Sequence, residues 1–328
     1  MNTAKIRKFD TSATLACIGT LLFWSVGPNF IKFLTGYLDL WTQNMLRYSV
    51  ACQFWLPFLL FALRKKRIDK SLWRRALLPA AANIVMQSLW AGGFYYIDPA
   101  FMVLLTKSSI IWIAGFSLIF FVDERALVRS KRFWLGVGLS AIGVVGVMYY
   151  KEDFAAIKTI TGIVIAMATA FMWAVYTISV KFAFRDIDSR SGFSVISIYT
   201  AGALCVLAFV FGSPQDCVKM DLWVWGCVVI SAVTAIALGH VLYYVAIRRI
   251  GATIPGLVIL AQPFTVFAIS NVFFEESLNK LQWFFGVVLL AGAALAIWAQ
   301  QHLRPVSTNN NNTGKSTPAE TCPSRHGW

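Results

Sequence analysis

Long apolar segments alternate with short polar connections over most of the chain. Ten of these segments approach the roughly 20 apolar residues that a membrane-spanning helix needs. They cover roughly residues 12–34, 41–63, 75–97, 100–122, 133–150, 159–182, 191–212, 222–247, 253–274 and 282–301. Because the segments are continuously apolar and unpaired backbone groups are costly in lipid, helices are expected rather than a β-barrel. The pattern predicts an all-α membrane protein with ten transmembrane helices.

The composition supports this class. Apolar residues make up 58% of the 328 residues and charged residues 13%, whereas soluble domains have about 45–50% and about 25%. The six cysteines show no CxxC spacing, which indicates small core residues rather than a metal site or a disulfide framework. The end of the chain is polar and low in complexity, so residues 302–328 are predicted to form a disordered cytoplasmic tail.

Lysine and arginine are distributed unevenly between the two sides of the membrane. If the N-terminus is cytoplasmic, 22 of the 29 basic residues lie in cytoplasmic segments, four lie outside and three lie within spans. The positive-inside rule then predicts an integral multi-pass protein of the cell (inner) membrane, with both termini cytoplasmic. The net charge of +14 therefore indicates anchoring in the lipid bilayer, and no nucleic-acid partner is expected.

The first half of the chain is repeated in the second half. Residues 20–33 (TLLFWSVGPNFIKF) match residues 169–182 (TAFMWAVYTISVKF) at a constant offset of 149. Each half holds five spans, and because five is odd, the halves must cross the membrane in opposite orientations. Residues 12–150 and 159–301 are therefore predicted to be two inverted five-helix repeats. Secondary transporters have this architecture, with a site at the repeat interface that is exposed to each side in turn.

Several sequence features resemble a known family. They are Trp24 through Lys32 with the copy Trp173 through Lys181, the phrase Asn44-Met45-Leu46-Arg47-Tyr48, the acidic residues after helices 4 and 9, and Glu276-Ser277-Leu278 followed by Gln282 to Gly286 and Gly292. In these features, over about residues 12–301, the chain resembles the EamA-type ten-helix branch of the drug/metabolite transporter superfamily. The resemblance implies carriage of small molecules, often export of amino acids or related metabolites.

The predicted spans lack the groups that an enzyme would need. All fifteen acidic residues lie in loops, in tails or at helix ends, and the sequence contains no phosphate loop. No catalytic residue, cofactor or metal site is therefore expected. A polytopic membrane enzyme is disfavoured but stays an alternative, and a carboxylate-based proton or sodium relay is disfavoured too.

Three cations lie within predicted spans: Lys32, Arg47 and Lys107. A charge near a helix centre costs about 2.5–3.5 kcal/mol on insertion scales, so Lys107 is expected to face a cavity or a polar partner. The predicted helix 100–122 has Lys107-Ser108 at the place where the predicted helix 253–274 has Gln262-Pro263. The first of these helices therefore has no proline that could bend it at this point. Arg47 is expected either to face the cavity or to anchor its helix at the membrane interface. Lys32 is expected to act either as part of a gate or as an anchor.

Polar and aromatic side chains form stripes on several predicted helices. Because such stripes are costly in lipid, they indicate a wet cavity. For any single residue the alternative is an interhelical hydrogen bond, worth about 0.6 kcal/mol on average, and His240 is expected to be neutral and hydrogen-bonded. The candidate substrate-binding residues are Trp24, Asn29, Arg47, Gln87, Trp90, Lys107, Trp173, Tyr176, His240, Tyr244 and Gln262.

These features predict a secondary transporter that moves a small metabolite by alternating access. Buried cations without a carboxylate would repel a cationic drug at low dielectric. The substrate is therefore expected to be anionic or zwitterionic and amino acid-like. The family resemblance further implies that the protein is an exporter. The alternatives are a polytopic membrane enzyme and a multidrug efflux carrier. The glycines of the predicted helices 133–150 and 282–301 allow close helix packing. The partner in that packing could be a second copy of the chain, so a homodimer is possible.

Overall fold

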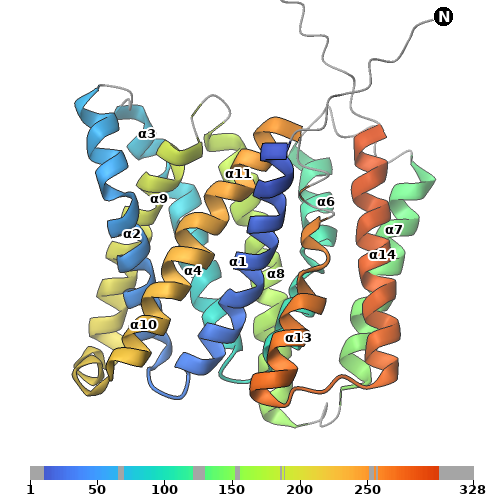
Figure 1. Cartoon of the computed structure of the whole chain (residues 1–328). Helices are drawn as coiled ribbons and strands as arrows, with labels where there is room; N and C mark the ends of the chain where they lie inside the picture. Colours follow the sequence, from blue (N-terminus) through green and yellow to red (C-terminus); the bar gives the residue numbers. More distant parts are fainter. Residues whose placement is uncertain are drawn as a thin grey trace, which may run out of the picture.

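The computed structural model of the protein describes residues 11–65, 70–120, 130–151, 156–184, 187, 189–250, 255 and 258–302. Every regular element within these ranges is helical, and the helices stand side by side in one bundle (Figure 1). In chain order they are α1 Thr11–Leu34, α2 Leu40–Arg64, α3 Lys70–Arg75, α4 Leu77–Gly93, α5 Pro99–Thr106, α6 Ser109–Phe120, α7 Lys131–Tyr149, α8 Ile157–Ala183, α9 Ser189–Phe211, η2 Pro214–Lys219, α10 Leu222–Ser231, η3 Ala232–Leu238, α11 Gly239–Ile250, α13 Gln262–Phe274 and α14 Lys280–His302.

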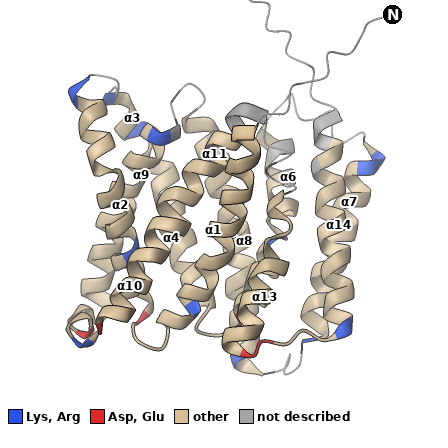
Figure 2. Cartoon of the chain, viewed as in Figure 1, with Lys and Arg blue, Asp and Glu red and all other residues tan. Residues whose placement is uncertain are grey.

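The described helices have the length and polarity of a membrane bundle. Six are long and apolar enough to cross a membrane, and shorter apolar helices accompany them. The six are Thr11–Leu34, Leu40–Arg64, Lys131–Tyr149, Ile157–Val180, Arg190–Phe211 and Leu222–Tyr243. Figure 2 shows the charged residues mostly at the two ends of the bundle, with few between them. The protein is therefore an integral, multi-pass membrane protein.

Several predicted spans are not single regular helices. The segment predicted at 100–122 is divided into α5 and α6 by a turn at Lys107-Ser108, although no proline stands there. The segment predicted at 222–247 runs from α10 through the π-helix η3 into α11. Part of the segment predicted at 253–274 and residues 303–328 of the predicted tail lie outside the described residues. Hydropathy alone therefore did not predict where helices break.

Asp39 fixes two helix ends at once. Its Oδ1 accepts hydrogen bonds from the backbone N–H groups of Trp41 (2.8 Å) and Thr42 (3.1 Å), which caps the start of α2. Its Oδ2 accepts one from the Ser213 N–H just after α9 (2.9 Å). Burial alone would raise the pKa of Asp39, but the hydrogen bonds outweigh burial and lower the pKa below its ordinary value.

Glu276 ties the loop after α13 to the start of α5. Its carboxylate accepts hydrogen bonds from the backbone N–H groups of Ala100 (3.0 Å) and Phe101 (2.9 Å) and from the Ser270 hydroxyl. A carboxylate at this place suits the positive end of a helix. Burial raises the pKa of Glu276, although the hydrogen bonds act in the opposite direction. The two halves of the chain are thus joined at this end of the bundle.

Helices of the two halves pack in corresponding pairs. α2 lies against α9, and α7 lies against α14. In the same way α1 of the first half packs on η3 and α11 of the second, and α8 of the second half packs on α4 of the first. Lys32, near the end of α1, donates a hydrogen bond to the Phe94 carbonyl just after α4 (3.2 Å). Gly162, near the start of α8, lies against Ile97 in the same region. α8 therefore starts at the end of the bundle where α1 finishes, and the two helices run in opposite directions.

Glycine brings α7 and α14 into close contact at one side of the bundle (Figure 1). A Cβ atom added at Gly136 would lie 2.6 Å from the backbone nitrogen of Ala296, and one at Gly143 would lie 2.4 Å from that of Leu289. Backbone atoms cannot move aside as the end of a flexible side chain can. Glycine is therefore required at these positions. Close packing within one chain explains why the predicted spans 133–150 and 282–301, now α7 and α14, are rich in glycine.

Gly143→Ala should lower the melting temperature of the purified protein in detergent, because the new methyl group would collide with the backbone of α14. Overpacking of this kind costs about 1–3 kcal/mol. Gly138→Ala is the matched control on the same helix, since nothing lies within 4 Å of its added Cβ. Equal melting temperatures for the two variants would contradict the packing of α7 on α14.

Candidate functional site

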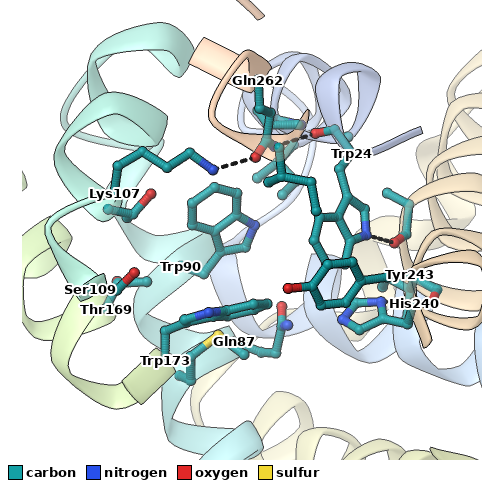
Figure 3. A pocket seen from close by; sticks show the side chains of 18 of the residues that line it. Trp24, Gln87, Trp90, Lys107, Ser109, Thr169, Trp173, His240, Tyr243 and Gln262 are labelled. Carbon is teal, nitrogen blue, oxygen red and sulfur yellow. Dashed lines mark hydrogen bonds between the residues drawn. The ribbon is translucent and has the colours of Figure 1, made fainter. Parts of the chain in front are cut away.

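A cavity of about 230 Å³ lies in the bundle. It is lined by residues of α1, α2, α4, α8, α11 and the segments around α5, α6, η3 and α13. Its wall combines aromatic rings with a few polar groups (Figure 3). The aromatic and polar members are Trp24, Arg47, Gln87, Trp90, Thr106, Lys107, Ser109, Thr169, Trp173, His240, Tyr243 and Gln262. Concave, mostly apolar sites with a few placed polar groups are the usual form of small-molecule sites.

Two interrupted helices meet at this cavity. Between α5 and α6 the backbone changes to i→i−3 hydrogen bonds, from the Lys107 N–H to Leu104 O (3.1 Å) and from the Ser108 N–H to Leu105 O (3.0 Å). A second turn immediately precedes α13, which begins at Gln262. Ser109 at the start of α6 and Gln262 at the start of α13 both line the cavity, so both turns lie at its wall.

Lys107 and Gln262 connect the two interruptions. Lys107 Nζ donates a hydrogen bond to Gln262 Oε1 at 2.7 Å, and Gln262 Nε2 donates to the backbone carbonyl of Trp24 at 2.7 Å (Figure 3). That carbonyl is available because Pro28, four residues later in α1, has no N–H to donate to it. A proline in one half thus provides the acceptor that orients a glutamine of the other half.

Trp24 lies at the centre of an aromatic group. Its ring centroid is 6.1 Å from that of Trp173, 5.2 Å from that of His240 and 5.0 Å from that of Tyr243. Its indole Nε1 donates a hydrogen bond to Ala235 O (3.0 Å), a carbonyl of the π-helix η3. Trp24 and its repeat partner Trp173 therefore meet edge to face in the wall of the cavity.

Arg47 is a second cation of the wall and is almost completely buried, with 2% of its surface exposed. Its Nε donates a hydrogen bond to Ser231 Oγ (3.1 Å), whereas Nη1 has no partner among the described residues. Nor does any carboxylate of the described residues form an ion pair with Arg47 or Lys107. The described wall therefore carries positive charge without a counter-charge.

His240 has a hydrogen bond that fixes its tautomer. Ring Nδ1 lies 2.9 Å from the backbone carbonyl of Ile236, and because a carbonyl only accepts, Nδ1 of the neutral ring carries the proton. The imidazole stacks on Phe193, with ring centroids 5.2 Å apart and the planes inclined by 23°. Its orientation at the cavity is therefore set by two separate contacts.

Comparison with known proteins agrees with this architecture. The model of the EamA-like transporter family matches residues 11–149 and again residues 160–298. The chain belongs to the EamA-like transporter family. Two successive matches of one family model also agree with the repeat found in the sequence.

Curated relatives of this EamA-like transporter are named only as uncharacterized transporters. The chain is 27% identical over 178 residues to one from Methanothermobacter thermautotrophicus, which covers 53% of this chain and 50% of that protein. It is 25% identical over 184 residues to one from Haemophilus influenzae, covering 55% of this chain and 59% of that protein. A third, from Synechocystis, is 26% identical over 192 residues, or 58% of this chain and 56% of that protein. The chain thus spans about half the length of the curated relatives it matches.

A protein of known crystal structure shares the fold. Its TM-score is 0.61 at 16% sequence identity, and the similarity covers 90% of this chain and 100% of that one. At this identity the likeness concerns the fold alone.

The structure places eight of the eleven candidate residues in the wall of the cavity: Trp24, Arg47, Gln87, Trp90, Lys107, Trp173, His240 and Gln262. Asn29 is not among the lining residues and donates to the Ser25 carbonyl of its own helix (3.1 Å). Tyr176 is buried in a hydrophobic cluster beside the cavity and is not a lining residue. The side chain of Tyr244 lies outside the described residues.

Sequence reasoning missed Tyr243, which lines the cavity and lies against Trp24. The pair Tyr243-Tyr244 could have indicated it. The sequence analysis predicts that Tyr244, the i+4 neighbour of His240, binds the substrate, whereas the structure places Tyr243, the i+3 neighbour, in the wall. Positions i+3 and i+4 share a helix face, so spacing does not distinguish them. Thr106, Ser109 and Thr169 were missed as well, because small hydroxyl residues are common in membrane helices.

Arg47→Met should leave the melting temperature of the ligand-free protein unchanged or raise it, because it removes a buried charge that has no described counter-ion. Arg47→Ala is the comparison variant and should lower the melting temperature, since it also leaves a void. Both are measured by thermal unfolding in detergent. A clear loss of stability in Arg47→Met would show that the guanidinium has a stabilising partner.

Proposed function

We propose that this protein is a secondary carrier that exports a small anionic or zwitterionic, amino acid-like metabolite by alternating access. The observation that carries the proposal is the contact between Lys107 and Gln262. It joins two helix interruptions, one from each half of the chain, beside a cavity whose described wall holds no carboxylate. Discontinuous helices whose half-helix N-termini point at anionic substrate groups are a known device of transporters.

Electrostatics favours a carboxylate near Lys107. The ammonium group of Lys107 places positive charge at one side of the cavity. A substrate carboxylate would replace the neutral amide oxygen of Gln262 as the partner of Lys107 and form a stronger, charge-assisted hydrogen bond. A lipophilic cation would be repelled by the same charge, which argues against the multidrug efflux alternative.

The dimensions of the cavity favour a small substrate with an apolar part. A volume of about 230 Å³ is below the roughly 300–1,000 Å³ of sites that take drug-sized ligands. The rings of Trp24, Trp90 and Trp173 supply apolar wall on several sides (Figure 3). An amino acid or a relative of similar size meets both conditions. Family membership further favours a carrier over a polytopic membrane enzyme.

The arrangement of the halves supports alternating access. We infer ten spans as two inverted five-helix repeats, residues 12–150 and 159–301, from the two family matches, the opposite directions of α1 and α8, and the corresponding packing pairs. At the end of the bundle where α1 finishes, Lys32 forms an ion pair with Asp98 (3.4 Å) and also bonds the carbonyl of Ile97 (3.4 Å). These contacts hold the end of α1 to the segment between α4 and α5.

Lys107→Met should abolish substrate binding and transport while the protein stays folded, because a substrate carboxylate loses its cationic partner. Transport is measured with proteoliposomes that contain the purified protein and a panel of radiolabelled amino acids and small carboxylates. Lys107→Arg keeps the charge and should retain part of the activity.

Lys151→Met is the matched control for this experiment. Lys151 forms an ion pair with Asp98 at 3.9 Å, outside the cavity wall, so its loss should leave substrate selectivity unchanged. Normal transport by Lys107→Met, or resistance of cells to quaternary ammonium compounds, would overturn the charge argument.

The distribution of basic residues gives an orientation that can be tested in cells. Single cysteines introduced at Lys66 and Arg129 in a cysteine-free background should react only after the cytoplasm is made accessible. Cysteines at Asp153 and Asp216 should react with an impermeant maleimide from outside. Labelling of a cysteine at position 66 from outside would contradict the proposed cytoplasmic position of the termini.

A further inference from the structure

Five exposed basic side chains gather at the end of the bundle where α2 finishes and α4 begins. They are Arg64 and Lys65 at the end of α2, and Lys70, Arg74 and Arg75 of α3. Figure 2 shows basic residues at this end of α2 and on α3. Within the described ranges no carboxylate forms an ion pair with any of the five. We call these five residues the α3 basic surface.

The outer surface of the bundle changes from apolar to basic at this point. On α2, the exposed ring of Phe61 precedes Lys65 by one turn. At the start of α4, Leu77 and Leu78 are exposed and come almost directly after Arg75. Exposed leucine and phenylalanine side chains of a membrane-spanning bundle face the lipid hydrocarbon. The α3 basic surface therefore lies where the hydrocarbon ends, at the level of the lipid headgroups.

Two long basic side chains at this end of the bundle lie over aromatic rings. Lys65 Nζ is 5.9 Å from the ring centroid of Phe61, and Cζ of Arg190, near the start of α9, is 5.3 Å from the ring centroid of Phe58. Lysine and arginine at a membrane surface lay their apolar stems along apolar side chains and keep the charged group among the headgroups. Both contacts agree with a headgroup level at the end of α2.

Packing fixes the direction in which α3 presents its charges. Leu72 is buried in a hydrophobic cluster with residues of α2, α4, α8 and α9. The ring of Trp73 meets that of Tyr199 edge to face, with centroids 5.8 Å apart, and the Trp73 carbonyl accepts a hydrogen bond from the Tyr199 hydroxyl (3.4 Å). With this side of α3 held against the bundle, its three basic residues remain exposed. The positive charges are thus held on the outside of the protein.

A negatively charged phospholipid is the partner that fits this place. A group of roughly four to eight lysines and arginines directly beside a membrane-spanning helix attracts anionic lipid. Ammonium and guanidinium groups form charge-assisted hydrogen bonds with phosphate oxygens. The positive-inside rule explains on which side of the membrane such residues lie, but it does not require the folded protein to select one lipid over another. Selection among lipids is therefore a separate property.

We propose that the α3 basic surface binds the headgroups of anionic phospholipids, so that the protein takes phosphatidylglycerol in preference to phosphatidylcholine from a mixed bilayer. The site lies on the outside of the bundle and shares no residue with the cavity wall. The inference goes beyond the proposed carrier function and does not depend on it. Each basic residue near the membrane surface strengthens the association with anionic lipid by roughly five-fold.

The experiment measures which lipid the full-length protein retains. Purified protein is placed in vesicles made of equal amounts of phosphatidylglycerol and phosphatidylcholine and is then extracted with mild detergent. Mass spectrometry gives the ratio of the two lipids that stay bound, at low salt and at 1 M salt. The test variant is Arg74→Gln/Arg75→Gln, and Arg74→Lys/Arg75→Lys keeps the charge. Melting temperatures report folding.

Lys131→Gln/Arg132→Gln is the matched control. These two adjacent residues are also basic and exposed, but they lie at the start of α7 and not on α3. The control therefore removes the same amount of charge from another place on the protein.

We expect wild-type protein at low salt to retain phosphatidylglycerol over phosphatidylcholine by about five-fold or more. The preference should fall at 1 M salt, where charges are screened beyond about 3 Å. Arg74→Gln/Arg75→Gln should reduce the ratio by at least about three-fold, whereas the lysine variant and the α7 control should keep it.

Three results would each overturn the proposal. The first is a wild-type protein that retains the two lipids equally or with a preference that salt does not change. The second is an undiminished preference in Arg74→Gln/Arg75→Gln. The third is an equal loss in the α7 control, which would show an effect of total charge rather than a site on α3. The wild-type salt dependence decides by itself if a variant does not fold.

Discussion

The ammonium group of Lys107, which is partly buried at the wall of the cavity, is the constraint on which the rest of the site depends. A lysine at this depth needs a polar partner because its charge is costly in an apolar surrounding. Gln262 supplies that partner, and its own amide is held by the Trp24 carbonyl that Pro28 leaves without an intrahelical donor. Three helices from the two halves are thereby fixed around one cavity. The charge that makes the site useful also specifies how the halves meet.

The sequence predicted the membrane class and eight of the twelve aromatic and polar residues of the cavity wall for one physical reason: polar groups at depth must face protein or water. That reasoning located Lys107, Gln87 and Gln262 correctly at the cavity. It did not locate the interruption at Lys107-Ser108, because helix breaks without proline depend on tertiary partners that hydropathy does not contain. For Asn29 the same reasoning was wrong. Its side-chain amide donates a hydrogen bond to the Ser25 carbonyl on the preceding turn of its own helix, so it does not need to face the cavity.

The two halves match the same family but differ in the chemistry of the cavity wall. Trp24 and Trp173 are equivalent positions of the sequence repeat, and their ring centroids lie 6.1 Å apart, which agrees with the proposed inverted repeat. Lys107 and Gln262 both lie at helix interruptions of corresponding segments, yet one is a cation and the other a neutral amide. An inverted pair of identical groups would present the same chemistry twice. The difference between them gives the cavity a direction, which a carrier of an asymmetric molecule needs.

Stability and function are divided between two parts of the bundle. Side-chain atoms without a described partner belong to α1 and α2, namely Asn29 Oδ1, Gln43 Oε1, Asn44 Oδ1 and Arg47 Nη1, and unsatisfied buried groups of this kind cost free energy. The glycine contact of α7 with α14 lies apart from them and packs backbone against backbone. Of these four residues only Arg47 lines the cavity. The close packing of α7 on α14 can therefore hold the fold while α2 keeps, in Arg47 Nη1, a group that a ligand can satisfy. A ligand shifts a conformational equilibrium only by its difference in affinity for the two states, and polar groups left unsatisfied in the empty protein are where such a difference arises.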